Sequence, residues 1–102
     1  MAIHVDPVGR EIELLRRLVR WRGRRVVEIG CGDGRLTRRL AALGARIVAI
    51  EPDAALVRAA RRAARQAWTP RLARRVSFHV GKAGRLKFPP GTFDLVLFSW
   101  AL

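Results

Sequence analysis

The sequence has a single cysteine, Cys31, and only two histidines among its 102 residues. One cysteine cannot form a disulfide within the chain, and one cysteine with two lone histidines does not supply a four-ligand zinc site. His4 and His79 have no neighbours at metal-ligand spacing, so no metal site is predicted. We therefore expect a fold held together by its apolar core in a reducing, cytoplasmic setting.

Long apolar runs are also missing. The longest uncharged stretch, residues 95–102, is far shorter than the roughly 20 apolar residues that span a bilayer. The N-terminus lacks the basic and then apolar pattern of a signal peptide, so neither a membrane span nor secretion is predicted. The chain is nevertheless 50% hydrophobic, which is too much for a disordered basic tail, and its length suits a single domain over residues 1–102.

Acidic residues are few. The chain has 8 Asp and Glu against 21 Lys and Arg, a formal net charge of +13, and 19 of the basic residues are arginine. A charge of this size predicts non-specific, salt-sensitive attraction to polyanions. It does not by itself identify a partner.

Part of the arginine content recurs at helical spacing in the segment that follows Asp53. One predicted helix face carries Arg58, Arg61, Arg62 and Arg65. The opposite face carries Leu56, Ala60, Ala63 and Ala67. A solvated helix face over a core is the favoured interpretation, and an RNA-binding stripe is the alternative.

Apolar segments and turn residues alternate along the chain. Strands are predicted at residues 26–29, 47–50, 76–80 and 93–100, with helices over 35–43 and from Asp53 to about Ala67. A further helix is predicted within residues 1–23, opening at Asp6-Pro7. The alternation predicts an α/β fold, a Rossmann-like doubly wound parallel sheet of about four strands, with residues 24–102 as a βαβαββ core.

A glycine-rich turn, Gly30-Cys31-Gly32-Asp33-Gly34, follows the first predicted strand of this core. Ligands of such sheets bind outside the carboxyl ends of the strands, and glycines let the backbone approach a ligand closely. The dinucleotide fingerprint requires a further glycine where Arg35 stands, and no triphosphate-binding P-loop motif occurs. The turn therefore does not favour NAD or a nucleoside triphosphate.

Five of the eight carboxylates lie in or beside strand ends or the turns that follow: Glu28, Asp33, Glu51, Asp53 and Asp94. Glu51 comes 23 residues after Glu28, at the tip of the second strand, where a carboxylate can accept hydrogen bonds from both hydroxyls of a ribose. An acidic turn without a phosphate-binding device predicts a site for a ribose-bearing cation.

Three segments together resemble the class I S-adenosylmethionine-dependent methyltransferases, particularly those acting on small molecules. These segments are residues 26–34, 47–53 and 92–102, and the resemblance covers nearly the whole chain from about Arg24 onward. It implies S-adenosylmethionine as cofactor and transfer of a methyl group to an unidentified, small-molecule acceptor.

The resemblance also implies a cofactor site made of Glu28, Gly30, Cys31, Gly32, Gly34, Glu51, Pro52, Lys82, Ala83 and Ser99. In the family the glycine turn runs beside the methionine part, the residue matching Glu51 binds the ribose, and the one matching Pro52 packs near the adenine. Ser99 and Trp100 match residues that close the methionine end.

Two of these acids have alternative roles. Glu28 either accepts hydrogen bonds from the glycine-turn amides or contacts the ammonium of the cofactor. For Glu51, ribose binding is favoured over charge complementarity at a helix start. Asp33 and Asp53 suit helix N-termini, and Asp94 is expected to be structural.

The segment Gly81-Lys82-Ala83 departs from the family pattern, which commonly has Gly-Asp-Ala with the Asp accepting from the adenine amino group. Lysine donates hydrogen bonds but cannot accept them. Recognition of adenine through a backbone carbonyl, weak binding of the cofactor and a degenerate site are the alternatives.

Methyl transfer from a sulfonium is an in-line displacement in which the protein mainly orients donor and acceptor. We therefore predict no catalytic residue. Cys31 has no positioned base beside it, so a nucleophilic role is disfavoured.

The family's sheet continues beyond its fourth strand, so the resemblance covers the N-terminal, cofactor-binding half of such an enzyme. The last predicted strand would then form an exposed edge, which a second polypeptide or self-association would cover. The alternatives to an active methyltransferase are a non-catalytic cofactor-binding remnant, a subunit that needs a partner chain, and an RNA-associated methyltransferase-like protein.

Overall fold

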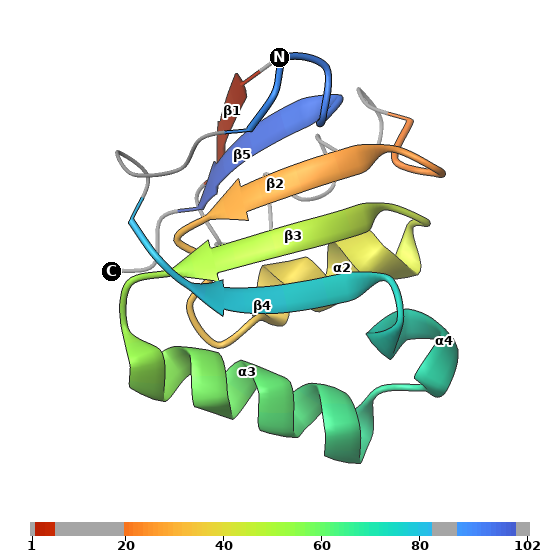
Figure 1. The fold of residues 1–102 in the computed structure, drawn as a ribbon. Helices are drawn as coiled ribbons and strands as arrows, with labels where there is room; N and C mark the ends of the chain where they lie inside the picture. Colours follow the sequence, from red (N-terminus) through yellow and green to blue (C-terminus); the bar gives the residue numbers. More distant parts are fainter. Residues whose placement is uncertain (1, 6–19, 83–87, 100–102) are drawn as a thin grey trace.

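The computed structural model describes residues 2–5, 20–82 and 88–99 (Figure 1). Its elements are β1 (Ala2–Val5), β2 (Arg25–Ile29), α2 (Arg35–Ala42), β3 (Arg46–Glu51), α3 (Ala54–Ala67), α4 (Pro70–Ala73), β4 (Val76–Val80) and β5 (Leu95–Ser99). The strands form one sheet in the order β1-β5-β2-β3-β4, and every pair is parallel. The α/β fold and the four strands predicted from the sequence are confirmed.

A fifth strand, β1, lies beside β5 at one edge of the sheet (Figure 1). Ala2 pairs with Val96 and Val5 with Ser99. The expectation of an exposed edge at the last strand is therefore wrong, because β1 covers it. Residues 2–5 form this strand ahead of the predicted helix, and the segment 6–19, in which that helix was predicted to open at Asp6-Pro7, lies outside the described residues.

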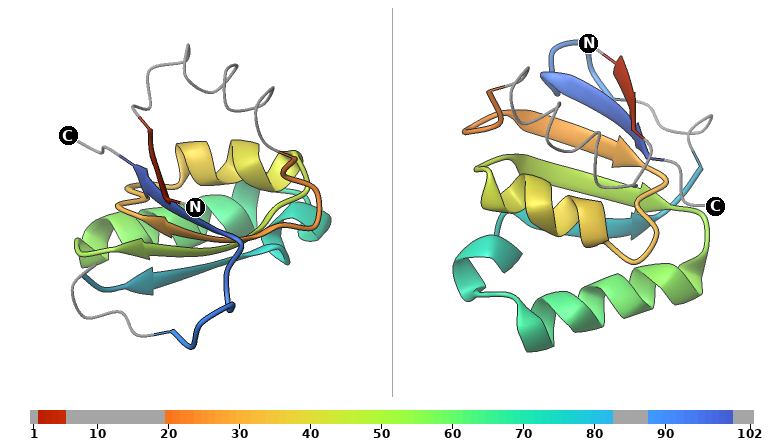
Figure 2. Two further views of the ribbon diagram at one scale, coloured as in Figure 1. Left: turned by 90° about the horizontal axis from the view of Figure 1, so that it is seen from above. Right: turned by 180° about the vertical axis from the view of Figure 1, so that it is seen from behind.

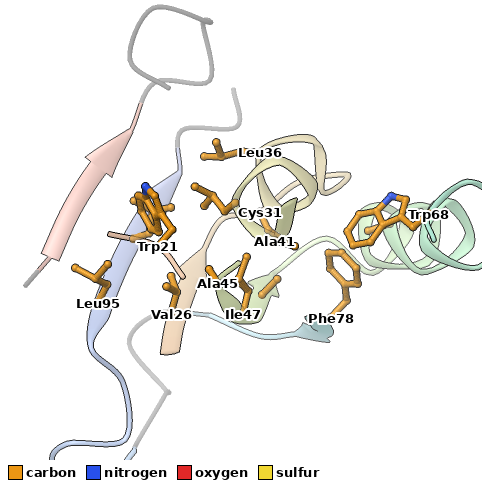
Figure 3. Close-up of a cluster of buried hydrophobic side chains, with 14 of the residues drawn as sticks. Trp21, Val26, Cys31, Leu36, Ala41, Ala45, Ile47, Trp68, Phe78 and Leu95 are labelled. Atoms are coloured by element: carbon orange, nitrogen blue, oxygen red, sulfur yellow. The ribbon is translucent and has the colours of Figure 1, made fainter. Parts of the chain in front are cut away.

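The helices α2 and α3 cover the same face of the sheet (Figure 2). Three of the strand residues that point to this face, Val26, Ala49 and Leu97, are completely buried. Figure 3 shows the resulting cluster, with Trp21 and Leu95 at one end and Trp68 and Phe78 at the other. Burial of apolar surface at about 25 cal/mol per Å² makes this layer the main source of stability.

The arginine-bearing face of α3 is exposed to solvent, as the favoured interpretation required. Val57 and Ala60 form its buried face, whereas Ala67, predicted to be on that face, is exposed. Arg61 differs from its neighbours because its guanidinium donates two hydrogen bonds to the carbonyl oxygen of Phe78, at 3.2 and 2.5 Å. It thereby satisfies a backbone acceptor of β4, the other edge strand.

Several turn and cap residues have the structural roles predicted for them. Asp53 is the N-cap of α3 and accepts a hydrogen bond from the backbone N of Ala55 at 2.9 Å. Asp94, just before β5, accepts hydrogen bonds from the backbone N of Arg25 at 2.8 Å and from its Nη2 at 3.4 Å. These two hydrogen bonds lower the pKa of the Asp94 carboxyl group. Among the helices of the described ranges, none has the length and apolar character needed to cross a membrane.

Candidate ligand site at the glycine turn

The glycine turn connects β2 to α2 at the carboxyl end of the sheet, and three of its residues have left-handed backbone conformations. Their φ values are 80° for Gly30, 58° for Gly32 and 88° for Gly34. A Cβ on Gly30 would lie 2.7 Å from the carbonyl oxygen of Ser99, and a Cβ on Gly34 would lie 3.1 Å from the ring of Phe78. The main chain of β5 therefore leaves no room for a side chain at position 30, whereas a side chain at position 34 would require a small shift of the Phe78 ring.

The backbone amides of the turn point inward. Gly30 and Cys31 both donate to the carbonyl oxygen of Ile50, at 2.7 and 3.2 Å, and Gly34 donates to that of Cys31 at 3.1 Å. Gly32 donates to Oε1 of Glu51 at 3.0 Å. A phosphate-binding loop needs free N–H groups, and these four are engaged, which agrees with the absence of a phosphate-binding motif in the sequence.

Glu51 joins the glycine turn to the start of α3. It is 5% exposed, and its second oxygen, Oε2, accepts a hydrogen bond from the backbone N of Asp53 at 2.8 Å. Asp53 is the N-cap residue of α3, so one of the two hydrogen bonds that hold Glu51 comes from the start of that helix. Each carboxylate oxygen has two acceptor positions, so each retains capacity for one more donor.

Glu28 is completely buried and lies under the turn. Its Oε1 accepts from the hydroxyl of Thr37 and its Oε2 from the hydroxyl of Ser99, both at 2.5 Å. Burial raises the pKa of the Glu28 carboxyl group, and the two hydroxyls oppose that rise in part. Glu28 thus connects β2, α2 and β5.

This placement corrects the prediction for Glu28. Of its two predicted roles, binding of a glycine-turn amide is wrong, because Gly32 donates to Glu51 instead, whereas contact with a cofactor ammonium stays a prediction for this buried side chain. The cause is the alternation of side chains along β2, which directs Glu28 to the face that α2 covers. Its partner Ser99 lies 71 residues away in the sequence, so no local pattern indicated the contact.

Cys31 is 6% exposed within the turn. Burial, and then the negative charges of Glu28 and Glu51, raise the pKa of its thiol to about 12. A thiol with this pKa is neutral and unreactive near neutral pH, which agrees with the expectation that Cys31 is not a nucleophile.

The remaining predicted residues lie around the carboxyl ends of the strands. Pro52 and Lys82 are exposed and Ser99 is half-buried, while Ala83 and Trp100 lie outside the described residues. Val80, which sequence analysis did not single out, is 55% exposed at the end of β4 and pairs with Glu51 in the sheet register. Over the described part of the chain, no three His, Cys, Asp or Glu side chains gather as a metal site.

The chain matches the model of a methyltransferase domain family over residues 26–102, and it belongs to that family. Its fold is similar to that of the glycopeptide N-methyltransferase MtfA in complex with S-adenosylmethionine, with a TM-score of 0.74 and 19% identity. That match covers 95% of this chain and 41% of MtfA. No relative was found among curated proteins.

Two further solved structures have similar folds. An S-adenosylmethionine-dependent methyltransferase from Mesorhizobium loti has a TM-score of 0.69 and 23% identity over 89% of this chain and 38% of its own. Phosphoethanolamine N-methyltransferase 1 from Haemonchus contortus has a TM-score of 0.69 and 26% identity over 87% of this chain and 18% of its own. The chain thus spans well under half the length of these proteins.

Proposed function

We propose that the chain binds S-adenosylmethionine at the glycine turn, as the cofactor-binding part of an enzyme that methylates a small molecule. The observation that carries this proposal is the direction of the hydrogen bonds in the turn. The amides of Gly30, Cys31, Gly32 and Gly34 donate to acceptors within the protein, and the next strand, β3, ends in the buried carboxylate of Glu51. A site of this kind accepts hydrogen bonds, so it favours a ligand with ammonium and hydroxyl donors over one with phosphates.

Individual residues fit parts of this ligand. The free acceptor positions of Glu51 would take the ribose hydroxyls, with the carboxylate held in place by Gly32 and Asp53. The exposed side chain of Val80, next to Glu51 in the sheet, offers an apolar surface to the adenine ring. Lys82 cannot accept from the adenine amino group, so that contact is assigned to a backbone carbonyl.

Glu28 acts through its neighbours in this proposal. Its carboxyl group holds Ser99 and Thr37, and so fixes the end of β5 against the start of α2, where the methionine part of the cofactor would lie. S-adenosylmethionine supplies an electrophilic methyl group when bound. The protein has to orient it and exclude water, which explains why no general base is assigned.

The comparisons support the reaction class more firmly than the acceptor. MtfA methylates a glycopeptide nitrogen and the Haemonchus protein is a phosphoethanolamine N-methyltransferase, yet this chain matches only 41% and 18% of them. The acceptor is therefore proposed only as a small molecule. The single buried thiol of Cys31 fits the predicted cytoplasmic location.

Calorimetric titration of the 102-residue chain with S-adenosylmethionine tests the proposal. We expect saturable binding that Glu51→Gln weakens at least about tenfold, since two charge-assisted hydrogen bonds are weakened. Asp94→Asn removes the same charge at the opposite end of β5 and should leave the affinity unchanged. NAD serves as the ligand control.

Absence of binding by a chain that circular dichroism shows to be folded would contradict the proposal. Equal loss in Glu51→Gln and Asp94→Asn would contradict the assigned role of Glu51. Saturable binding without methyl transfer to any of a panel of small amines would favour the alternative of a binding subunit or remnant.

A further inference from the structure

A hollow of about 260 Å³ lies at the end of the sheet opposite the glycine turn, where β2, β3 and β4 begin. Four arginines line it: Arg25, Arg46, Arg74 and Arg75. Val48 and Phe93 contribute apolar surface to the same hollow. It combines several cationic residues with apolar side chains in an open hollow.

The four guanidinium groups differ in what they already bind. Arg25 pairs with Asp94 at 3.4 Å, and Nη1 of Arg75 donates to the carbonyl oxygen of Ala41 at 2.9 Å. Arg25 keeps further N–H donors, because a guanidinium has five, whereas the hydrogen bond to Ala41 directs the Arg75 guanidinium toward α2. Arg46 and Arg74 are exposed, and neither has a side-chain hydrogen bond or ion pair with another residue of the described ranges.

Arg46, Val48 and Ser77, three of the residues that line the hollow, lie on the face of the sheet opposite α2 and α3. Arg46 and Val48 alternate along β3 with Ile47 and Ala49, which belong to the core beneath the helices. The helix α3, which carries the other cluster of arginines, lies over the opposite face of the sheet (Figure 2). A compact basic hollow of this kind suits a small anion better than an extended polymer.

We infer that this hollow is a second binding site, for a small molecule that carries a phosphate group. Arginine is suited to this role, since its planar fork of donors matches the geometry of phosphate oxygens. Arg46 and Arg74 would supply the main contacts and Val48 and Phe93 would contact the body of the ligand. The site is separate from the glycine turn, which lies at the carboxyl ends of the same strands.

Titration of the full chain with inorganic pyrophosphate, followed by calorimetry at fixed salt, tests this site. Arg46→Gln with Arg74→Gln should weaken binding at least about tenfold, because two uncommitted guanidiniums are lost. The matched control, Arg58→Gln with Arg62→Gln on α3, removes the same charge from exposed positions and should change the affinity less than about twofold. Circular dichroism establishes that each variant is folded. The affinity of each variant for S-adenosylmethionine should be unchanged, so a failure of the pyrophosphate site can be distinguished from a failure of the proposed function.

Equal weakening by both pairs of substitutions would overturn the inference, since it would mean that the overall charge attracts the anion. Pyrophosphate binding that fails to saturate would overturn it as well. Single-stranded RNA is the last comparison. If it binds more tightly than pyrophosphate and both pairs of substitutions weaken its binding equally, the arginines bind polyanions in general and do not form a site for a small phosphate.

Discussion

The carbonyl oxygen of Ser99 lies 2.7 Å from the position that a Cβ on Gly30 would occupy. Real Cβ atoms essentially never come this close to a backbone oxygen. The end of β5 and the start of the glycine turn are thus in contact through their main chains, and the hydrogen bond between Ser99 and Glu28 holds them there.

Gly30→Ala should therefore destabilise the protein beyond the cost of its left-handed backbone, which is about 1–2 kcal/mol for an alanine. Gly23→Ala is the matched control, because Gly23 has a similar φ of 73° but nothing within 4 Å of its would-be Cβ. Urea unfolding gives both free energies. Equal decreases in the free energy of unfolding of the two variants would show that the contact with Ser99 adds no destabilisation.

The stability of the wild-type chain should contain a pH-dependent contribution from Glu28. Burial raises the pKa of this carboxyl group in the folded state, so the folded chain holds its proton more tightly than the unfolded one. The contribution is fully present below the unfolded pKa and is lost as the pH rises through the folded pKa. Glu28→Gln should remove this slope, and a difference between wild type and variant that stays constant with pH would contradict the prediction.

Thr37 and Ser99 should be energetically coupled because both bind the Glu28 carboxyl group. Thr37→Val or Ser99→Ala alone should cost about 1–3 kcal/mol by leaving a buried acceptor unsatisfied. Loss of one hydroxyl favours protonation of Glu28, so loss of the second hydroxyl should lower the free energy of unfolding by less. A double-mutant cycle should therefore give a coupling energy of about 0.5–3 kcal/mol. Additive losses in urea unfolding would show that the two hydroxyls act independently.

Cys31 should react very slowly with thiol reagents in the folded protein. With a pKa of about 12, roughly one molecule in ten thousand carries the thiolate at pH 8, and the side chain is 6% exposed. We expect labelling to be at least about a hundredfold slower than in urea, where a free cysteine has a pKa of about 8.5. Labelling at comparable rates in both conditions would mean that the glycine turn opens readily.

Removal of residues 1–5 should expose the edge of β5 that β1 covers. An unpaired apolar edge strand favours self-association, so sedimentation of the shortened chain should show a larger, concentration-dependent mass than that of the intact chain. An unchanged sedimentation profile and urea midpoint would show that β1 contributes nothing to the sheet.

Local sequence patterns were sufficient to predict the strands, turn and helix cap that form the candidate site. The apolar runs of β2 and β3, the glycine turn and the Asp53 cap each depend on neighbouring residues, and each is found where it was predicted. The short helix α4 was missed, although Thr69 caps it and Pro70 occupies its first turn. In a segment of four helical residues these signals are the same as those of a turn.

Features that depend on distant partners could not be predicted. The role of Glu28 depends on Ser99, and Arg61 depends on a carbonyl oxygen of β4. The four-residue strand β1 has too short a pattern to be recognised, and only its pairing with β5 defines it. The exposure of Val80 beside Glu51 likewise follows from the arrangement of the sheet.

The pairing of Ala2 with Val96 also has a consequence for biosynthesis. β1 is synthesised before the other described strands, yet its partner β5 is synthesised after all of them, whereas β3 and β4 each follow a neighbour that is already made. Closing so long a loop carries an entropic cost that the nearer strand pairs avoid. The pairing of β1 with β5 should therefore form last among the described strand pairs, and until then the edge of β5 that β1 covers can pair with any other strand that reaches it.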